Sequence, residues 1–206
     1  LDTEVDWNRS GIIMKNVIIT GANSGLGFET AKKIANSGIE YRLILACRNV
    51  QKGEDAKKSI IAESGNENIV VMELNTASLD SVRRFAGEYE ESGYGKIYAL
   101  FCNAGVSGTN SGRTEDGFDV IFETNHLGHF LLTNLLLPWM EEEGLIFATS
   151  SDMHDSPMGK MEWNSTETLA HPNAALAYES IRYSYSKLCN LYFVYELAER
   201  LRSQGR

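Results

Sequence analysis

One stretch of the chain decides its fold: Val17-Ile18-Ile19-Thr20-Gly21-Ala22-Asn23-Ser24-Gly25-Leu26-Gly27-Phe28. Its first residues are apolar and β-branched, which is typical of a buried strand. Three glycines follow within seven residues, and beyond Gly27 apolar residues recur at helical spacing with lysines on the opposite face. A strand, a glycine turn and a helix in this order can bind a phosphate group, because the bare loop permits close approach and the helix N-terminus offers unpaired N–H groups.

The spacing of the glycines, G-x-x-x-G-x-G, differs from the usual dinucleotide fingerprint G-x-G-x-x-G. No Lys-Ser or Lys-Thr pair follows them, which disfavours a loop that binds nucleoside triphosphates. A tight turn without a ligand is the alternative interpretation of the glycines alone. The agreement of strand, loop and helix favours a dinucleotide site.

The composition indicates one ordinary globular domain: 206 residues, 43% of them hydrophobic. The formal charge of −9 argues against nucleic acid or an anionic membrane surface as the main partner. No apolar run reaches the length of a membrane span, so we expect none. The three cysteines lack metal-binding spacing, which predicts no metal site and favours a reduced, cytoplasmic setting.

Strand-like and helical patterns alternate along the chain. We predict strands at 17–19, 41–47, 69–73, 96–102 and 145–149, and helices at 28–36, 48–63, 78–91, 118–140 and 177–202, the fourth broken near Thr124. Residues 150–174 are expected to be irregular. This alternation predicts an α/β fold, a doubly wound parallel sheet in a three-layer α/β/α arrangement, with ligands beyond the carboxyl ends of the strands.

Small and polar residues follow each predicted strand, which is the layout of a shared cleft. Cys47 and Arg48 follow the second strand, where an NAD-specific protein usually places a carboxylate for the ribose. A neutral residue followed by arginine suits a 2′-phosphate, so we expect NADP(H), with NAD(H) disfavoured. A solvated arginine at a helix start is the alternative. The later strands are followed by Asn75-Thr76, Asn103-Ala104-Gly105 and Ser150-Ser151.

The last predicted helix carries Tyr183 and Lys187 one turn apart, hence on one face. A neighbouring ammonium stabilises phenolate, which allows a tyrosine to exchange a proton with a hydroxyl or carbonyl oxygen. An ordinary surface pair is the alternative. Tyr185, two residues from the lysine, should point elsewhere on the helix.

Together these features resemble the short-chain dehydrogenase/reductase family over about residues 15–202. The motifs that carry the resemblance stand in the family's order: Thr20-Gly21-Ala22-Asn23-Ser24-Gly25-Leu26-Gly27, Asn103-Ala104-Gly105, Asn125, Ser151 and Tyr183-x-x-x-Lys187. The resemblance implies a Rossmann fold that binds NAD(P) at residues 15–206. Residues 1–14 are interpreted as an N-terminal arm or a vector remnant.

The resemblance also implies roles. Tyr183 would donate and accept the proton, and Ser151 would hydrogen-bond the substrate oxygen, with Ser150 as the alternative. Lys187 would hold the nicotinamide ribose and favour the phenolate, and Asn125 would position a water that relays protons through Lys187. The implied cofactor-binding residues are Gly21, Asn23, Ser24, Gly25, Leu26, Gly27, Arg48, Asn75, Thr76, Asn103, Ala104, Gly105, Tyr183 and Lys187.

Within the family, residues 46–49 and 124–132 are similar to retinol dehydrogenases and light-dependent protochlorophyllide reductases, and residues 186–190 lean toward the reductases. That branch favours NADP(H). His126 and His129 could be metal ligands or bases but are interpreted as structural, and Cys189 as a core residue rather than a catalyst.

The chain departs from the family pattern in three places. Asn75 stands where the family usually has Asp beside the adenine, and Cys102 replaces the first Asn of Asn-Asn-Ala-Gly. The family also continues with another strand, a Pro-Gly turn and a segment that covers the substrate, whereas this chain stops at Arg206. We therefore expect a C-terminal part to be missing, which would leave the substrate pocket unfinished.

The sequence predicts an NADP(H)-dependent oxidoreductase that moves hydride between nicotinamide and a carbonyl/alcohol pair of a fairly apolar small molecule. The alternatives are a photoreductase acting on a C=C bond of a tetrapyrrole and a non-catalytic NADP(H)-sensing regulator. Spare apolar surface on the 125–140 and 177–202 helices suggests a homodimer, unless the missing segment covers it. On the last helix we expect Leu188, Leu191 and Val194 to face the sheet.

Overall fold

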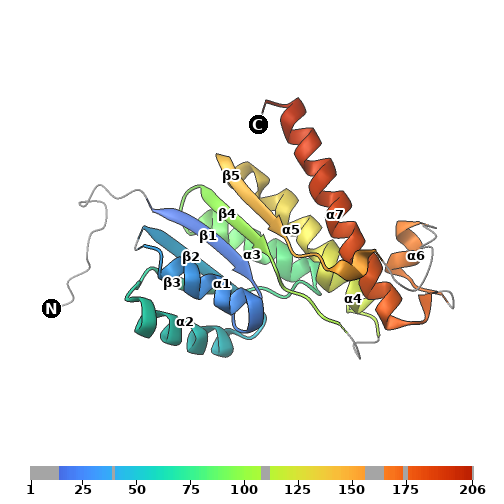
Figure 1. Ribbon diagram of the computed structural model, residues 1–206, viewed down its shortest axis with the longest axis horizontal. Helices are drawn as coiled ribbons and strands as arrows, with labels where there is room; N and C mark the ends of the chain where they lie inside the picture. The colour runs from blue at the N-terminus through green and yellow to red at the C-terminus, as the bar shows by residue number, and fades with distance from the viewer. Residues whose placement is uncertain (1–13, 39, 108–111, 156–164, 174–175, 206) are drawn as a thin grey trace.

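The computed structural model describes residues 14–38, 40–107, 112–155, 165–173 and 176–205. Its centre is a five-stranded parallel sheet in the order β3-β2-β1-β4-β5 (Figure 1). The strands are β1 (Lys15–Thr20), β2 (Tyr41–Cys47), β3 (Ile69–Glu73), β4 (Ile97–Cys102) and β5 (Met140–Ala148). The chain moves outward from β1 to β3 and then returns to the other side of β1. The doubly wound parallel sheet predicted from the sequence is therefore confirmed.

Helices cover both faces of the sheet because the strand residues are apolar on both sides. Leu43 and Leu45 of β2 pack with α1 (Gly25–Ala35) and α2 (Val50–Ser64), whereas Ile44 between them packs with α3 (Leu79–Glu91) and α5 (Gly128–Leu136). Successive strand side chains point to opposite faces, so a continuous apolar run requires cover on both. The three-layer α/β/α arrangement is confirmed.

The predicted helix over 118–140 consists of four shorter pieces. They are α4 (Val120–Phe122), a π-turn (Glu123–Leu127), α5, and a 3₁₀ turn (Leu137–Trp139) that contains Pro138. The expected break near Thr124 is the π-turn. The helical region ends at Trp139, one residue before its predicted end. The prediction that the fifth strand begins at 145 is wrong, because β5 already begins at Met140. No partner strand lies on the outer side of β5 among the described residues, which lets an acidic run (141–143) lie in a strand half open to solvent.

The predicted irregular segment contains a 3₁₀ turn (Asp152–His154) and a short helix, α6 (Thr166–Ala170). It leads to the long helix α7 (Glu179–Ser203), whose far end extends past the sheet (Figure 1). A satellite core joins α4, α6 and α7. Its buried members are Phe122, Leu169, Ala170, Leu176, Tyr185 and Cys189.

On α7, Leu188, Leu191 and Val194 are half-buried, and the fully buried face is mostly polar. It consists of Ser184, Tyr185, Ser186, Lys187, Cys189 and Asn190. The reason is that the first half of α7 lies against the end of β5 and the π-turn, where backbone carbonyls need hydrogen-bond donors.

Two further observations concern the described residues as a set. None of their helices combines the length with the apolar composition that crossing a membrane requires. No group of three or more His, Cys, Asp or Glu side chains among them could hold a metal ion. The predicted arm at residues 1–14 lies almost entirely outside the described ranges.

Candidate active site

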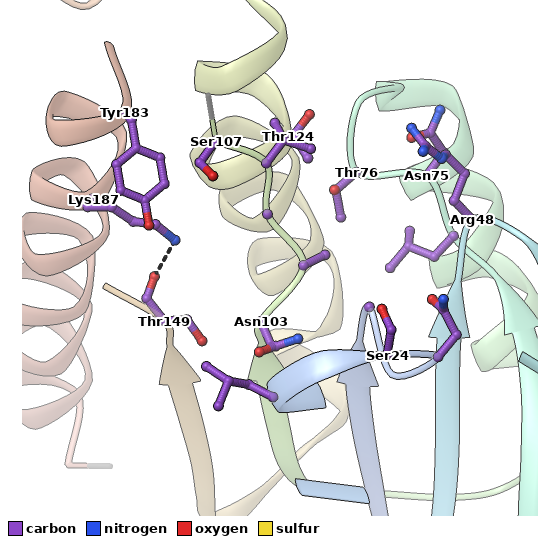
Figure 2. A pocket seen from close by; sticks show the side chains of 17 residues that line it. Ser24, Arg48, Asn75, Thr76, Asn103, Ser107, Thr124, Thr149, Tyr183 and Lys187 are labelled. Carbon is purple, nitrogen blue, oxygen red and sulfur yellow. Dashed lines mark hydrogen bonds between the residues drawn. The ribbon is translucent and has the colours of Figure 1, made fainter. Parts of the chain in front are cut away.

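A cleft of about 460 Å³ opens at the carboxyl ends of the strands, between β1 and β4, where the strand order in the sheet changes direction. Figure 2 shows Tyr183 and Lys187 on one wall, Arg48 and Asn75 on the other, and Ser24 on the glycine loop. The lining residues are Gly21, Asn23, Ser24, Leu26, Arg48, Leu74, Asn75, Thr76, Asn103, Ala104, Gly105, Val106, Ser107, Thr124, Thr149, Tyr183 and Lys187.

The glycine loop leads into α1, whose first turn differs from those of the neighbouring helices. Asn49 caps α2 by accepting from the Lys52 N–H, and Ser78 caps α3. No described side chain caps α1, and its first turn carries no acidic residue. The N–H groups at this helix end are thus available to an anion, and the dipole favours one there.

Two glycines allow the loop to pack tightly. Gly21 has a φ of +66°, a backbone conformation that residues with a side chain rarely adopt. A Cβ on Gly27 would lie 2.6 Å from the carbonyl oxygen of Gly21 and 2.6 Å from Nδ2 of Asn103. Gly27 therefore allows α1, the glycine loop and the turn after β4 to meet beneath the cleft.

The hydroxyl of Thr20 holds the turn after β4 in place. It accepts from the backbone N–H groups of Asn103 (2.9 Å) and Ala104 (2.8 Å), and it lies 2.8 Å from Nε2 of His129. His129 Nδ1 lies 3.2 Å from the carbonyl of Asn125, which can only accept. Nδ1 therefore carries the proton, and Thr20 donates to Nε2. Burial lowers the pKa of His129 to about 4, so the ring is neutral at physiological pH.

On the opposite wall, α7 brings Lys187 to the end of β5. Lys187 Nζ donates to the Thr149 carbonyl (3.0 Å) and lies 5.4 Å from the centre of the Tyr183 ring (Figure 2). The lysine is 4% exposed, and burial lowers its pKa. A Cβ on Gly105 would lie 3.2 Å from Asn125 Oδ1 and 3.7 Å from Lys187 Nζ, so the turn passes close to both.

The π-turn and α7 are joined by two amide side chains. Asn125 Oδ1 accepts from the Val106 N–H (2.7 Å), and its Nδ2 donates to the Val106 carbonyl and to Ser186 Oγ (both 3.0 Å). Asn190 Nδ2 donates to the carbonyls of Asn125 (3.2 Å) and Thr149 (3.0 Å). His126 Nδ1 lies 3.0 Å from Asn190 Oδ1, which orients that amide.

A second hollow of about 580 Å³ adjoins the cleft, and Tyr183 and Ser107 line both. Ser151 lines this hollow together with Asp152, Met153 and residues of the first turn of α7. In contrast, Ser150 Oγ donates to the Lys187 carbonyl (2.9 Å), which turns that hydroxyl toward the helix. The geometry thus favours Ser151 over Ser150 as the serine that a molecule in the hollow could reach.

The sequence model for "short chain dehydrogenase" matches residues 15–164. The chain belongs to the short-chain dehydrogenase family. That family resemblance, predicted from the motifs, is confirmed.

Among curated members of the family, human retinol dehydrogenase 11 is 40% identical over 195 residues, which is 93% of this chain and 58% of the relative. The chicken WW domain-containing oxidoreductase is 38% identical over 198 residues, 93% of this chain and 46% of the relative. This chain thus spans about half the length of these relatives.

Solved structures share the fold. A crystal structure of an uncharacterised protein from Mycobacterium paratuberculosis matches with a TM-score of 0.75 and 39% identity, covering 93% of this chain and 64% of that one. A metagenomic short-chain oxidoreductase in complex with NADP matches with a TM-score of 0.72 at 22% identity, covering 93% and 78%.

Most residues that the family resemblance implies lie at one cleft. Gly25, Gly27 and Asn125 lie outside its lining; Gly27 and Asn125 support it from behind, and Ser151 lines the adjoining hollow. The contacts of Asn125 described above involve protein atoms, and its role in holding a water stays a prediction. Tyr185 is buried in the satellite core, away from the cleft, as expected.

Sequence reasoning missed several residues of this short-chain dehydrogenase site. Thr20 lies in the decisive stretch but was given no role, and its position directly before Gly21 could have indicated one. Asn190 gave no signal, because its hydrogen-bond partners lie 65 and 41 residues away in the sequence. The added lining residues are Leu74, Val106, Ser107, Thr124 and Thr149.

Proposed function

We propose that residues 15–206 form an NADP(H)-binding catalytic domain that moves hydride between nicotinamide and a carbonyl/alcohol pair of a fairly apolar small molecule. The observation that carries the proposal is the position of Tyr183, which borders both the cleft at the glycine loop and the hollow lined by Ser151. A phenol at that junction can reach a substrate on one side and a cofactor on the other.

The residues present fit a dinucleotide. The uncapped start of α1 suits a pyrophosphate, and the glycines at 21 and 27 leave no side chain beneath it. Arg48 is exposed at the far wall, where it would pair with a 2′-phosphate, and Lys187 would bind ribose hydroxyls. When bound, the cofactor supplies the hydride, and the protein supplies orientation and a proton route.

The chain's own part in the reaction is proton transfer to or from the substrate oxygen. Tyr183 exchanges the proton, and Lys187 Nζ lies 5.4 Å from the centre of its ring. Ser151 holds the oxygen by a hydrogen bond. Its hydroxyl donates to Asp152 Oδ1 (2.9 Å), so it has to turn toward the substrate.

The decisive test replaces Tyr183 with Phe. Because relatives at 40% identity are named retinol dehydrogenases, all-trans-retinal with NADPH is the first probe, and a short polar aldehyde is the contrast. Tyr183→Phe should reduce turnover by at least about 1,000-fold and leave NADPH affinity nearly unchanged. Tyr185→Phe is the matched control.

Two outcomes contradict the proposal: turnover in Tyr183→Phe equal to that of the unaltered chain, or no turnover in the unaltered chain. Turnover of a tetrapyrrole pigment that requires light would instead favour a photoreductase.

Cofactor preference rests on Arg48. Arg48→Asp should weaken NADP(H) binding much more than NAD(H) binding, because only the former carries the 2′-phosphate. Lys52→Asp, on the exposed side of α2, introduces the same charge change outside the cleft lining and serves as the control. An equal loss for both cofactors assigns Arg48 a structural role.

We also propose a homodimer through α5 and α7. Phe130 and Leu135 of α5 are exposed, and so are Tyr192 and Tyr195 of α7, at 57% and 69%. Contiguous apolar surface on two adjacent helices commonly marks an interface, and a two-fold pairing closes it. Light scattering should give the dimer mass at micromolar concentration and the monomer mass for Tyr192→Glu/Tyr195→Glu. A monomer without substitution refutes the pairing.

A further inference from the structure

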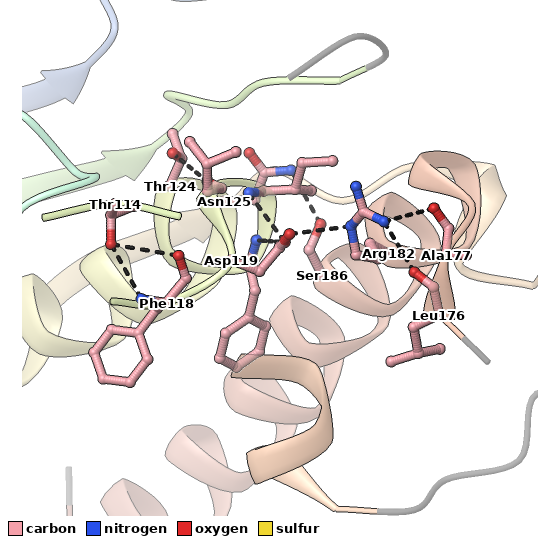
Figure 3. A network of polar contacts seen from close by, with 12 residues as sticks. Thr114, Phe118, Asp119, Thr124, Asn125, Leu176, Ala177, Arg182 and Ser186 are labelled. Carbon is pink, nitrogen blue, oxygen red and sulfur yellow. Dashed lines mark hydrogen bonds and ion pairs between the residues drawn. The ribbon is translucent and has the colours of Figure 1, made fainter. Parts of the chain in front are cut away.

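A buried ion pair links the starts of α4 and α7 (Figure 3). Arg182 Nε lies 3.0 Å from Asp119 Oδ2, and the two side chains are 10% and 4% exposed. The Nε–H is not aligned on the oxygen, so charge rather than a directed hydrogen bond holds this contact. Neither residue lines the cleft.

Both charges also hold backbone groups. Arg182 Nη1 donates to the carbonyls of Leu176 (2.9 Å) and Ala177 (2.8 Å), the residues that lead into α7. Asp119 Oδ1 accepts from the N–H groups of Ile121 (3.1 Å) and Phe122 (2.9 Å), the first turn of α4. The pair therefore fixes one helix start against the other.

The location of the arginine is unfavourable by itself. Arg182 lies in the first turns of α7, where the helix dipole repels a positive charge. No described side chain caps this helix at Tyr178. A buried ion pair rarely adds net stability, because both ions lose their hydration. Its effect is instead geometric: it permits one arrangement of the two helices.

That arrangement determines where Tyr183 lies. Arg182 directly precedes it, and one turn later Ser186 Oγ donates to the Tyr183 carbonyl (2.7 Å) and accepts from Asn125 Nδ2 (3.0 Å). The turn of α7 that carries the phenol is thus held on one side by the ion pair and on the other by the π-turn (Figure 3).

We propose that Arg182 and Asp119 are positioning residues that hold the Tyr183 ring between the cleft and the adjoining hollow. The proposal rests on the proposed function for its catalytic consequence but not for its structural content. The pair acts through the backbone of α7 and touches neither substrate nor cofactor.

The test compares Arg182→Met, which removes the charge, with Arg182→Lys, which keeps it. Arg182→Met should lower kcat for retinal reduction by about 100-fold, the loss expected from a misplaced catalytic group, and should leave the NADPH dissociation constant within about 3-fold. Arg182→Lys should recover part of kcat. Arg182→Met leaves the buried carboxylate of Asp119 unpaired. If that variant does not fold, the doubly neutral variant Arg182→Gln/Asp119→Asn replaces it in both measurements.

A spectroscopic measurement reports the ring position without turnover. In protein labelled with 3-fluorotyrosine, the ¹⁹F resonance of residue 183 is identified by its loss in Tyr183→Phe. It should move in Arg182→Met, or in the double variant, and return toward its original position in Arg182→Lys. Ile60→Ala, a fully buried change on α2, controls for general destabilisation and should leave it in place.

Each result of these experiments either supports or overturns the positioning role of Arg182 and Asp119. An unmoved resonance in the charge-removing variant, or the same movement in Ile60→Ala, overturns the positioning role, as does a kcat within about 2-fold of the unaltered chain. If the unaltered chain turns over none of the probes, the proposed function fails, and the ¹⁹F result alone decides whether the pair positions Tyr183.

Discussion

Two walls of the cleft are held by different means: a first wall formed by the glycine loop and the turn after β4, and a second wall formed by α7. Beneath the glycine loop, strand ends meet through backbone groups, and one hydroxyl, that of Thr20, joins β1 to the turn after β4. At the other wall, side chains tether α7: Lys187 and Asn190 to the end of β5, Ser186 to the π-turn, and Arg182 to α4. The first wall is set by strand register, the second by individual polar pairs. A single substitution should therefore disturb them in different ways.

The largest effect is expected at the first wall, from Thr20→Val. Removing the hydroxyl leaves two N–H groups without their acceptor and His129 Nε2 without its donor, which should lower the free energy of unfolding by about 4 kcal/mol. Urea unfolding measures it. Thr20→Ser keeps the hydroxyl and should lose less than half as much; an equal loss would assign the effect to packing.

Glu123, at the start of the π-turn, should give a pH-dependent effect of about 3 kcal/mol. Its carboxyl is fully buried, and burial raises its pKa from 4.5 to about 7. A raised carboxyl pKa favours the native state at low pH, and the advantage is lost as pH rises from about 4.5 to 7. Glu123→Gln should therefore raise Tm at pH 8 and hardly change it at pH 4.5. Equal Tm shifts at both pH values would show that ionisation is not the cause.

Asn190→Ala tests the second wall and should lower the free energy of unfolding by about 2 kcal/mol. It removes the donor to two backbone carbonyls and the partner of His126. Hydrogen exchange should show faster opening in the first half of α7 than in α1. Uniformly faster exchange would mean that the two walls are not independent.

The smallest effect is expected from Arg83→Ala on α3. Its contact with Asp80 (3.6 Å) is an exposed ion pair, so its loss should change the free energy of unfolding by less than about 0.5 kcal/mol. Thermal unfolding of Arg83→Ala should be compared with that of Arg182→Met. The second variant should lose more stability, because the ion pair of Arg182 with Asp119 is buried. A large effect at Arg83 would mean that exposure does not separate the two.

The sequence predicted the first wall well because its signals are local. The run from Val17 to Gly27 contains strand, turn and helix start in one continuous stretch, and β2 and β3 occupy the predicted ranges. Apolar alternation and glycine positions depend on neighbours in the chain, which a single sequence reveals.

The second wall depends on pairs that sequence spacing does not reveal. Asn125 and Ser186 lie 61 residues apart, and Lys187 meets a carbonyl 38 residues away. The polar face of α7 was missed because an apolar stripe was sought, whereas the facing surface consists of backbone carbonyls. The start of β5 was missed because an acidic run is atypical of a strand with partners on both sides.

The π-turn has a consequence for how this region can change by mutation. A π-turn holds one residue more than an α-helical turn, so a one-residue deletion within 123–127 would restore an ordinary helix. The two ends would keep nearly the same relative rotation, because five residues in a π-turn and four in an α-helix both turn the chain by slightly more than one revolution. The cost would fall inside the turn, where Asn125 Oδ1 accepts from the Val106 N–H and a deletion would shift the residue that makes this contact. Among descendants of this gene, substitutions should accumulate here while the number of residues stays constant.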